Sequence, residues 1–513
     1  MDTEVFVCQH NPIDRIAPDI YGHFAEHLGR CVYGGLWVGE DDQVSTDEGI
    51  REDTTALLAD LDAPVLRWPG GCFADDYHWK DGVGPREERP RRRNMWWPQG
   101  RGRVPEESNA FGTEEFLALC EKIDTEPYLA VNVGSGDPRE AVDWAEYCNY
   151  DGETEMTRLR AESGSEQPHG VTYWGVGNEN WGCGGRFSPE AYAEQFRHYA
   201  NYLNTFDRVM GDGSMELVAC GHIADDWNRR FLDYLAECVD FGENTVYDLM
   251  DHLSVHRYYY AGGDTDFTED QYYRLFARTA QIATDVDRAA EALELLAPGT
   301  DIGVIVDEWG VWHPEAVFGN GLEQEHTVRD ALSAAVVLDD LNARADVVSM
   351  ANIAQTVNVL QCLVQTDETD AWPTPTYHVY DLYKPHMGAT ALDTVVDADT
   401  ETVERKGDEF GEGDVHEVPL VSASASERDG QVYVTVSNVD KNDAREIVVS
   451  LDSDAIGVES ASVLFDGLSV DTYSDGGNTE AFQPSEIPVE RSGDRSVLVE
   501  APPSSVVGLS LSV

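Results

Sequence analysis

The sequence predicts an α/β protein in which a (β/α)8 TIM barrel is followed by a C-terminal all-β sandwich domain that is jelly-roll-like. Three observations lead to this fold. Between residues 16 and 355, short apolar runs typical of strands recur eight times. Amphipathic segments with apolar residues at three- and four-residue spacing separate these runs. Beyond about residue 390 the pattern changes to short alternating strands.

Eight strand–helix units over about 340 residues fit a closed barrel better than an open doubly wound sheet, which usually has fewer strands. The runs expected as barrel strands are Ile16–Gly22, Val65–Trp68, Tyr128–Val133, Tyr173–Gly177, Leu217–Gly221, Leu253–Tyr258, Ile302–Val306 and Val347–Ile353. The segments expected as helices include Glu114–Ile123, Ala141–Asn149, Pro189–Leu203, Gln271–Leu296 and Glu325–Leu341. We assign the catalytic barrel to residues 15–390.

The C-terminal β-sandwich is assigned to residues 391–513. After the turn signal Asp429-Gly430, Val432, Val434 and Val436 alternate with polar residues, as in a strand with one buried face. Residues 1–14 contain a further strand-like run, and we expect this N-terminal strand to pair with the C-terminal sheet.

The charge of the chain excludes several classes of partner. The chain of 513 residues has 35 Lys plus Arg against 97 Asp plus Glu, a formal net charge of −62. Nucleic acids and anionic membranes would repel such a surface, so we expect neither as a partner. A hydrophobic content of 42% is enough for a packed core, so the acidity does not indicate disorder.

The basic residues are almost all arginine, since Lys80, Lys122, Lys384, Lys406 and Lys441 are the only lysines. Acidic residues spread along the whole chain make a surface whose self-repulsion is relieved by salt. We interpret the combination as that of a halophilic protein. The alternative is an ordinary acidic mesophilic enzyme.

The cysteines and the N-terminus bear on localisation. Nine cysteines occur without any C-x-x-C pair, and an odd, unclustered set predicts reduced thiols rather than a disulfide framework or a zinc ribbon. The N-terminus lacks a secretion signal, and no apolar run approaches membrane-spanning length. We therefore expect a cytoplasmic protein.

Two predicted strands end in a glutamate beside a tryptophan, and in a parallel barrel the strand ends build the active site. The fourth strand continues into Gly177-Asn178-Glu179-Asn180-Trp181, and the seventh into Asp307-Glu308-Trp309. Strands four and seven lie on opposing sides of the ring, so the two carboxylates can face each other. Paired carboxylates with aromatic neighbours are the machinery of glycoside hydrolysis. The alternative for either glutamate alone is a cap or an ion-pair partner.

Asp307 competes with Glu308 for the catalytic position. Adjacent strand residues point to opposite faces, so only one of the two is expected to enter the barrel. We assign Glu308 to the site and Asp307 to a structural role.

No cofactor or metal is predicted. The pairs His23/His27 and His252/His256 lie four residues apart on predicted strands, about 13 Å, which is too far for one ion. Gly175-Val176-Gly177 does not continue as a dinucleotide motif, and there is no P-loop.

An arginine-rich segment follows the second predicted strand, with Trp96 and Trp97 between its arginines. Such a pattern can bind single-stranded nucleic acid, but the net charge opposes this. There are three other interpretations: the arginines pair with acidic neighbours, the segment forms a subunit contact, or Trp96 or Trp97 lies over the substrate. We favour the last. The arginines are Arg86, Arg89, Arg91, Arg92, Arg93, Arg101 and Arg103.

Taken with further motifs, the chain resembles the α-L-arabinofuranosidases of glycoside hydrolase family 51. Gly-Asn-Glu alone marks only a wider clan of barrel glycosidases, but the whole series in order is specific. The resemblance implies a barrel followed by a β-sandwich, retention of anomeric configuration, no metal cofactor and a hexameric homo-oligomer. It rests on the motifs 20–29, 67–71, 81–85, 177–179, 307–309 and 351–355.

Carried over by position, Glu179 resembles the general acid/base and Glu308 the nucleophile. The resemblance also places Asn178 on the sugar 2-hydroxyl. Residues that match the sugar-binding or nucleophile-orienting positions are Glu26, Arg67, Tyr258 and Gln355. Cys72 either touches the sugar or fills space, because many relatives have Asn at this position.

The resulting hypothesis is an exo-glycosidase that removes terminal non-reducing α-L-arabinofuranosyl residues from arabinose-containing oligosaccharides of arabinan and arabinoxylan. The alternatives are an endo-glucanase or β-xylosidase on the same barrel, or a non-catalytic carbohydrate-binding protein.

Overall fold

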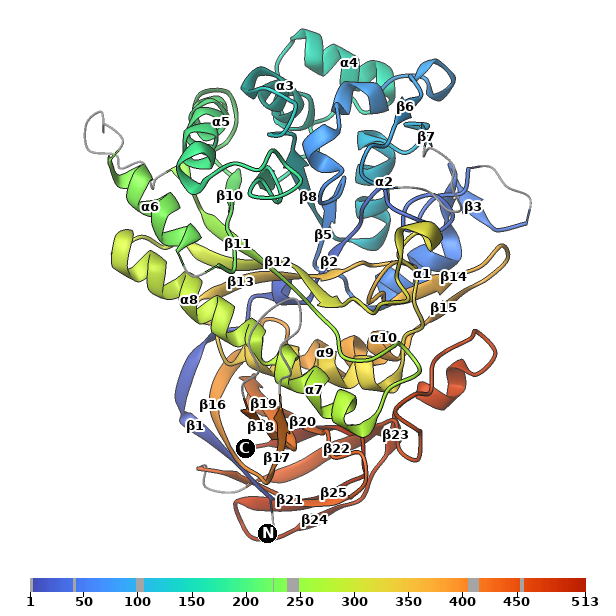
Figure 1. The fold of residues 1–513 in the computed structure, drawn as a ribbon, viewed down its shortest axis with the longest axis vertical. Helices are drawn as coiled ribbons and strands as arrows, with labels where there is room; N and C mark the ends of the chain where they lie inside the picture. Colours follow the sequence, from blue (N-terminus) through green and yellow to red (C-terminus); the bar gives the residue numbers. More distant parts are fainter. Residues whose placement is uncertain are drawn as a thin grey trace.

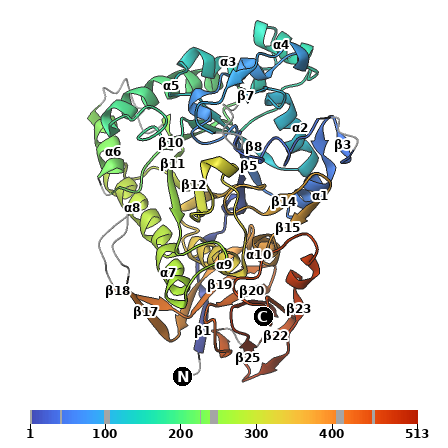
Figure 2. The ribbon, with the colours of Figure 1, turned by 45° about the vertical axis from the view of Figure 1, so that its right-hand side comes forward.

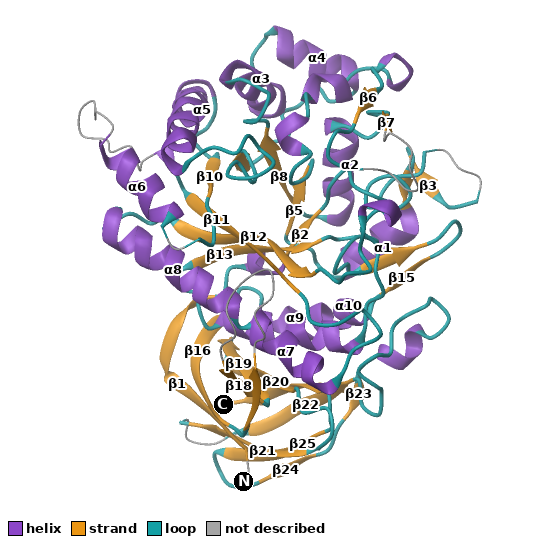
Figure 3. Cartoon of the chain, in the orientation of Figure 1, coloured by secondary structure: helices purple, strands orange, loops and turns teal. Residues whose placement is uncertain are grey.

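The computed structural model describes residues 3–39, 43–97, 106–224, 226–237, 249–404, 415–452 and 456–513. Eight parallel strands close into a barrel, helices surround it, and a ten-stranded sheet lies at one end of the molecule (Figure 1, Figure 3). The predicted fold class, a barrel followed by an all-β domain, is confirmed.

The barrel uses one strand from each of the eight predicted regions. Its strands are β2 (Gly22–Phe24), β5 (Val65–Trp68), β8 (Glu126–Val131), β9 (Tyr173–Val176), β10 (Glu216–Cys220), β11 (His252–Tyr259), β12 (Gly303–Val311) and β13 (Val348–Ala354). The first strand begins later than predicted, because Pro18 opens a 3-10 turn over Pro18–Tyr21. Proline suits the first position of such a turn, since it lacks an N–H and has a fixed φ.

The predicted helices form, with one difference. A single helix was expected over Gln271–Leu296, whereas two helices meet at Ala280. The apolar periodicity runs through this junction, so the pattern alone does not reveal it. The helices are α1 (Glu52–Asp60), α2 (Thr113–Ile123), α3 (Pro138–Asn149), α4 (Glu155–Ser163), α5 (Pro189–Met210), α6 (Trp227–Glu237), α7 (Glu269–Thr279), α8 (Gln281–Leu296), α9 (Val328–Asn342) and α10 (Pro375–Tyr383).

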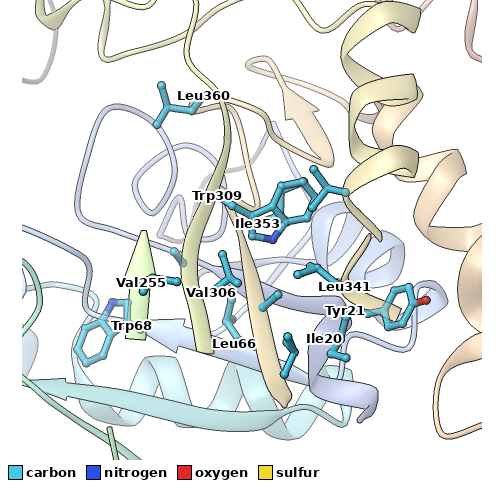
Figure 4. Close-up of a cluster of buried hydrophobic side chains, with 14 of the residues drawn as sticks. Ile20, Tyr21, Leu66, Trp68, Val255, Val306, Trp309, Leu341, Ile353 and Leu360 are labelled. Atoms are coloured by element: carbon cyan, nitrogen blue, oxygen red, sulfur yellow. The ribbon is translucent and has the colours of Figure 1, made fainter. Parts of the chain in front are cut away.

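Side chains alternate between two cores along the barrel strands. Val65 of β5 and Ile305 of β12 belong to a small cluster inside the barrel. Their neighbours Leu66 and Val306 belong to the large core that also includes the helices (Figure 4). This alternation brings the next inward residue of β5, Arg67, to the axis of the barrel.

The N-terminal strand β1 (Thr3–Arg15) lies inside the C-terminal sheet, between β16 and β21. In Figure 2 it is the blue strand among orange and red ones. Valines of β1 and valines of the C-terminal strands share one apolar core. The other strands are β16 (Thr390–Asp397), β19 (Val421–Arg428), β20 (Gln431–Asn438), β21 (Arg445–Leu451), β22 (Gly457–Leu464), β23 (Ser485–Glu486), β24 (Val489–Arg491), β25 (Ser496–Ala501) and β26 (Ser505–Ser512).

Four two-stranded hairpins complete the strands: β3 (Thr46–Asp47) with β4 (Ile50–Arg51), β6 (Arg92–Arg93) with β7 (Glu106–Glu107), β14 (Val364–Thr366) with β15 (Ala371–Pro373), and β17 (Thr400–Glu404) with β18 (Val415–Pro419). Among the residues described, no helix combines the length and apolarity that crossing a bilayer requires.

Candidate active site

The residues predicted for the site gather at the C-terminal ends of the barrel strands, which we call the mouth. Arg67, Tyr258 and Glu308 lie within β5, β11 and β12. The others follow β2, β5, β9 and β13 directly, and they are Glu26, Cys72, Asn178, Glu179 and Gln355.

Glu308 is a buried carboxylate held by two donors. Arg67 Nη1 donates to its Oε1 at 2.9 Å, and the Tyr258 hydroxyl donates to its Oε2 at 2.8 Å. Burial acts to raise the pKa of Glu308, but His256 and Arg67 outweigh it, so this pKa lies below the ordinary value. Glu308 is therefore ionised at neutral pH. A Cβ on Gly71 would lie 2.7 Å from its Oε1, so a larger residue there would displace this carboxylate.

His256 joins Glu308 to Glu179. Its Nδ1 lies 3.0 Å from Glu179 Oε1 and 3.7 Å from Glu308 Oε1. Burial lowers the pKa of His256, yet the two carboxylates raise it above its usual value. The three side chains each contribute an atom to a group within 4.8 Å of one another. The sequence reasoning considered His256 only as a metal partner of His252. One signal could have found it: His256 lies two residues before Tyr258, so both side chains point to the same face of the strand and into the site.

Asn178 faces the same guanidinium as Glu308. Arg67 Nη2 donates to Asn178 Oδ1 at 2.6 Å. The oxygen of Asn178 is thereby engaged, and its Nδ2 amide is oriented away from Arg67.

Asp307 also enters the barrel, contrary to the prediction that only one of the two acids does so. The pairing between β11 and β12 shifts by one residue here, so that Val255 pairs with Val306 but His256 with Glu308. The extra residue interrupts the alternation, as in a β-bulge. The Asp307 carboxylate accepts from Tyr128 at 2.9 Å and from Asn352 at 3.0 Å, and it lies 3.4 Å from Arg67 Nε.

Glu26 is a second buried carboxylate of the mouth. It accepts from the backbone of Gly71 and Phe73, from Trp97 Nε1 at 2.7 Å and from Gln355 Nε2 at 3.1 Å. Burial and the nearby charge of Glu308 raise the pKa of Glu26 to about 7. Trp97 thus reaches the site from the arginine-rich segment.

Several described arginines of that segment pair with acids. Arg86 and Arg89 both donate to Glu115, and Arg92 donates to Asp81 at 2.6 Å. Arg101 and Arg103 lie outside the described residues. The described part of the patch is therefore largely neutralised rather than open to phosphates.

The prediction of nine reduced thiols is wrong for two of them. Cys72, after β5, and Cys183, after β9, form a disulfide, so Cys72 presents no thiol to a sugar. The two cysteines are 111 residues apart, and the pairing of β5 and β9 with β8 between them brings their loops together. Six other cysteines are free, and Cys238 lies outside the described residues.

Asp75 was missed by the sequence analysis and ties three loops together. It accepts from the backbone of Val133 and Gly134 after β8 and from Asn180 Nδ2 beside Glu179. Burial raises the pKa of Asp75 to about 7. Its own loop carries Cys72, so Asp75 positions the backbone around both sulfur atoms and Glu179.

The tryptophans of the two catalytic segments divide into two kinds. Trp174 and Trp309 are fully buried in the core. Trp181 and Trp312 are half-buried, and Trp312 makes an edge contact with Tyr258. The second pair therefore includes the aromatic surfaces nearest to the mouth.

Comparisons with known proteins identify the family of the chain. The sequence matches the α-L-arabinofuranosidase 1 domain over residues 57–274 and the α-L-arabinofuranosidase C-terminal domain over residues 307–505. An intracellular exo-α-L-arabinofuranosidase of Bacteroides ovatus is 37% identical over 506 residues, which are 97% of this chain and 93% of that protein.

Solved structures extend the likeness to the whole fold. The GH51 arabinofuranosidase of Xanthomonas axonopodis pv. citri superimposes with a TM-score of 0.89, 32% identity and 99% of both chains covered. The Thermotoga maritima α-L-arabinofuranosidase in its arabinose complex gives a TM-score of 0.83, 28% identity and 100% coverage of both chains. The chain is thus a glycoside hydrolase and belongs to the α-L-arabinofuranosidases of glycoside hydrolase family 51.

Proposed function

We propose that the protein is a retaining, exo-acting α-L-arabinofuranosidase that removes terminal non-reducing arabinofuranosyl residues from oligosaccharides of arabinan and arabinoxylan. The spacing of Glu179 and Glu308 carries this proposal, since an oxygen of each lies within 4.8 Å of the other and of His256. Retaining glycosidases hold their carboxyl groups about 5–5.5 Å apart, whereas inverting ones need about 6.5–9.5 Å for a water molecule.

Glu308 is the nucleophile. Its low pKa keeps it ionised, and it attacks the anomeric carbon to form a glycosyl-enzyme. Glu179 donates a proton to the leaving oxygen, and it later takes a proton from the water that cleaves the glycosyl-enzyme. Tyr258 and Arg67 hold the two oxygens of Glu308 in place for attack.

The remaining residues bind the sugar. Glu26, oriented by Gln355 and Trp97, accepts from its hydroxyl groups. Because Arg67 occupies the oxygen of Asn178, the Asn178 amide donates to the 2-hydroxyl. Exo action and an intracellular location follow the name of the Bacteroides ovatus relative.

Hydrolysis of 4-nitrophenyl α-L-arabinofuranoside, beside the β-D-xyloside and β-D-glucoside, tests the substrate class. We expect strong preference for the arabinofuranoside, lost in Glu179→Ala and Glu308→Ala. Azide should restore turnover of Glu179→Ala and give the glycosyl azide with the substrate's anomeric configuration. A product of inverted configuration from the wild type would refute the retaining mechanism.

We further propose a halophilic protein, because the acidic surface is accompanied by so few lysines. Screening relieves the mutual repulsion of the carboxylates, so the melting temperature should rise as KCl increases into the molar range. Differential scanning calorimetry at constant pH measures this. A melting temperature that does not depend on KCl would contradict the proposal.

The proposal also includes a cytoplasmic location. It further includes a homo-oligomer, a hexamer, which the family resemblance implies. Light scattering in high KCl measures the assembly, and a monomer at all protein concentrations would exclude it.

A further inference from the structure

Two sulfur atoms and the proposed acid/base lie together at the mouth. Cys183 Sγ is 3.8 Å from Glu179 Oε2, and Cys72 Sγ is bonded to Cys183 Sγ. One atom from each of Cys72, Cys183 and Glu179 falls within a group no wider than 4.8 Å. All three residues are half-buried, so the group is accessible from solvent.

The other oxygen of Glu179 is already held. His256 Nδ1 contacts Oε1 at 3.0 Å, whereas Cys183 Sγ lies next to Oε2. Carboxylates that ligate a metal are commonly oriented in this way by a second hydrogen-bonding partner. Glu179 therefore presents Oε2 to the sulfur pair in a fixed direction.

We propose that reduction of the Cys72–Cys183 disulfide creates a binding site for a thiophilic divalent cation, Zn²⁺ in the first instance. Its ligands are the two thiolates and Glu179 Oε2, with the fourth position open to water. Three protein ligands with a fourth position open to water are the usual coordination of zinc in catalytic sites.

The geometry of the backbone permits such a site. A tetrahedral ion with Zn–S distances of about 2.3 Å holds its sulfur atoms about 3.8 Å apart. The Cα atoms of Cys72 and Cys183 are 5.6 Å apart. Rotation of the two side chains therefore separates the sulfur atoms far enough without moving either loop.

The chemistry balances in two steps. The disulfide accepts two electrons and two protons from a dithiol, which becomes a disulfide itself, and two cysteine thiols result. The cation then binds both sulfur atoms and displaces their two protons to solvent. While it is bound, Glu179 Oε2 cannot carry the proton that the leaving group needs.

A competing group consists of Glu179, His256 and Glu308, which also lie within 4.8 Å of one another. The Arg67 guanidinium contacts Glu308 at 2.9 Å and repels a cation there. Among the described residues, these two groups are the clusters whose spacing suits a metal ion. Only the group of Cys72, Cys183 and Glu179 contains sulfur.

Cobalt(II) titration of the full-length protein tests the site without any assay of turnover. The protein is reduced with a phosphine, desalted without oxygen and compared with its oxidised form. We expect one cobalt ion per chain with a thiolate-to-cobalt charge-transfer band in the reduced protein, and no such band in the oxidised protein. Binding of equal strength by both forms would place the ion on the histidine and glutamates and overturn the proposal.

Variants assign the ligands. Cys183→Ser leaves one of the two thiolates, so it should weaken cobalt binding and reduce the charge-transfer band. Glu179→Gln should weaken cobalt binding but leave the band in place at saturation. Cys8→Ser, on the sheet far from the mouth, should bind as the wild type does. Equal binding by Cys183→Ser and wild type would show that other thiols hold the ion. The comparison of reduced and oxidised wild type does not depend on any variant folding.

Zinc should then inhibit only the reduced enzyme, a consequence that rests on the role proposed for Glu179. Saturating Zn²⁺ should lower turnover by roughly 10²- to 10⁴-fold, the usual contribution of general acid–base catalysis, and a chelator should reverse this. If the protein hydrolysed no arabinofuranoside at all, the proposed function would fail while the cobalt titration still decided the metal site. If the reduced protein bound cobalt but kept its turnover in saturating Zn²⁺, the proposed inhibition would be refuted.

Discussion

Buried acids occur in two regions of the molecule, and their surroundings give them opposite properties. At the mouth, Glu308 lies against Arg67 and His256, and its pKa is lowered. At the seam between α9 and the C-terminal sheet, Asp339 is equally buried but contacts hydroxyl groups, those of Tyr383, Ser422 and Thr435. Burial raises the pKa of Asp339 to about 7.

The comparison shows that a nearby cation, more than burial, decides the charge state of these acids. Hydroxyl donors do not offset the loss of water around Asp339, whereas a guanidinium and an imidazole more than offset it for Glu308. Glu26 supports this conclusion from within the mouth. It accepts four hydrogen bonds but contacts no cation among the described residues, and burial together with the charge of Glu308 raises its pKa to about 7.

The largest effect should come from removing the charge of Glu308. Glu308→Gln keeps the shape of the side chain but cannot attack the anomeric carbon, so kcat should fall by at least about 10⁴-fold. Steady-state kinetics and a melting curve separate this from unfolding. Glu446→Gln, on an exposed position of β21, is the matched control and should keep full activity. Comparable activity in the two variants would remove Glu308 from the mechanism.

Removing one of the two cations should shift the charge state of Glu308. In the wild type, the acid limb of the pH profile should follow a pKa below the ordinary glutamate value. His256→Gln removes a positive charge, so this acid limb should move to higher pH, and kcat should fall roughly 10- to 100-fold. The pH dependence of kcat/KM measures both. An acid limb that stays in place would show that Arg67 alone sets the pKa.

At the seam between α9 and the C-terminal sheet, removing the charge of the buried acid Asp339 should change the stability of the protein. The folded pKa of Asp339 is raised above its unfolded value, so its contribution to stability is present below about pH 4 and lost as the pH rises through about 7. Asp339→Asn cannot ionise and should gain about 2–3 kcal/mol relative to wild type between pH 5 and pH 8, because one pKa unit corresponds to about 1.4 kcal/mol. Chemical denaturation at the two pH values measures the difference. A difference that does not change with pH would mean that Asp339 is ionised throughout.

The smallest effect should come from one of the donors to Glu26. Trp97→Phe removes a single hydrogen bond while keeping an aromatic ring against Phe318. A net hydrogen bond contributes about 0.5–1.5 kcal/mol, so kcat/KM should fall roughly 2- to 12-fold with little change in melting temperature. A loss as large as that of Glu308→Gln would instead assign Trp97 a direct role in catalysis.

Much of the fold was predictable because it depends on local patterns. Apolar runs and helical periodicity identified eight barrel strands, since each strand must bury one face inside the barrel and one against helices. The patterns failed at Pro18 and Ala280, where a turn interrupts an apolar sequence without changing its periodicity.

The site was predictable only in part. Glu179 and Glu308 were recognisable because each follows an apolar run in the sequence and precedes a tryptophan. The importance of His256 was not, since it depends on carboxylates from two other strands. Asp75 was hidden in the same way, because its partners lie in loops far along the chain.

The sequence by itself determined the order of strands and helices, the acidic surface and the residue types at the strand ends, since all of these are properties of neighbouring residues. The tertiary structure decided which of those residues touch. The pairing of β5 and β9 with β8 brought Cys72 to Cys183, the shifted register of β12 turned both Asp307 and Glu308 toward Arg67, and the cations around Glu308 set its charge. These outcomes depend on distances between segments far apart in the chain, which no local pattern encodes.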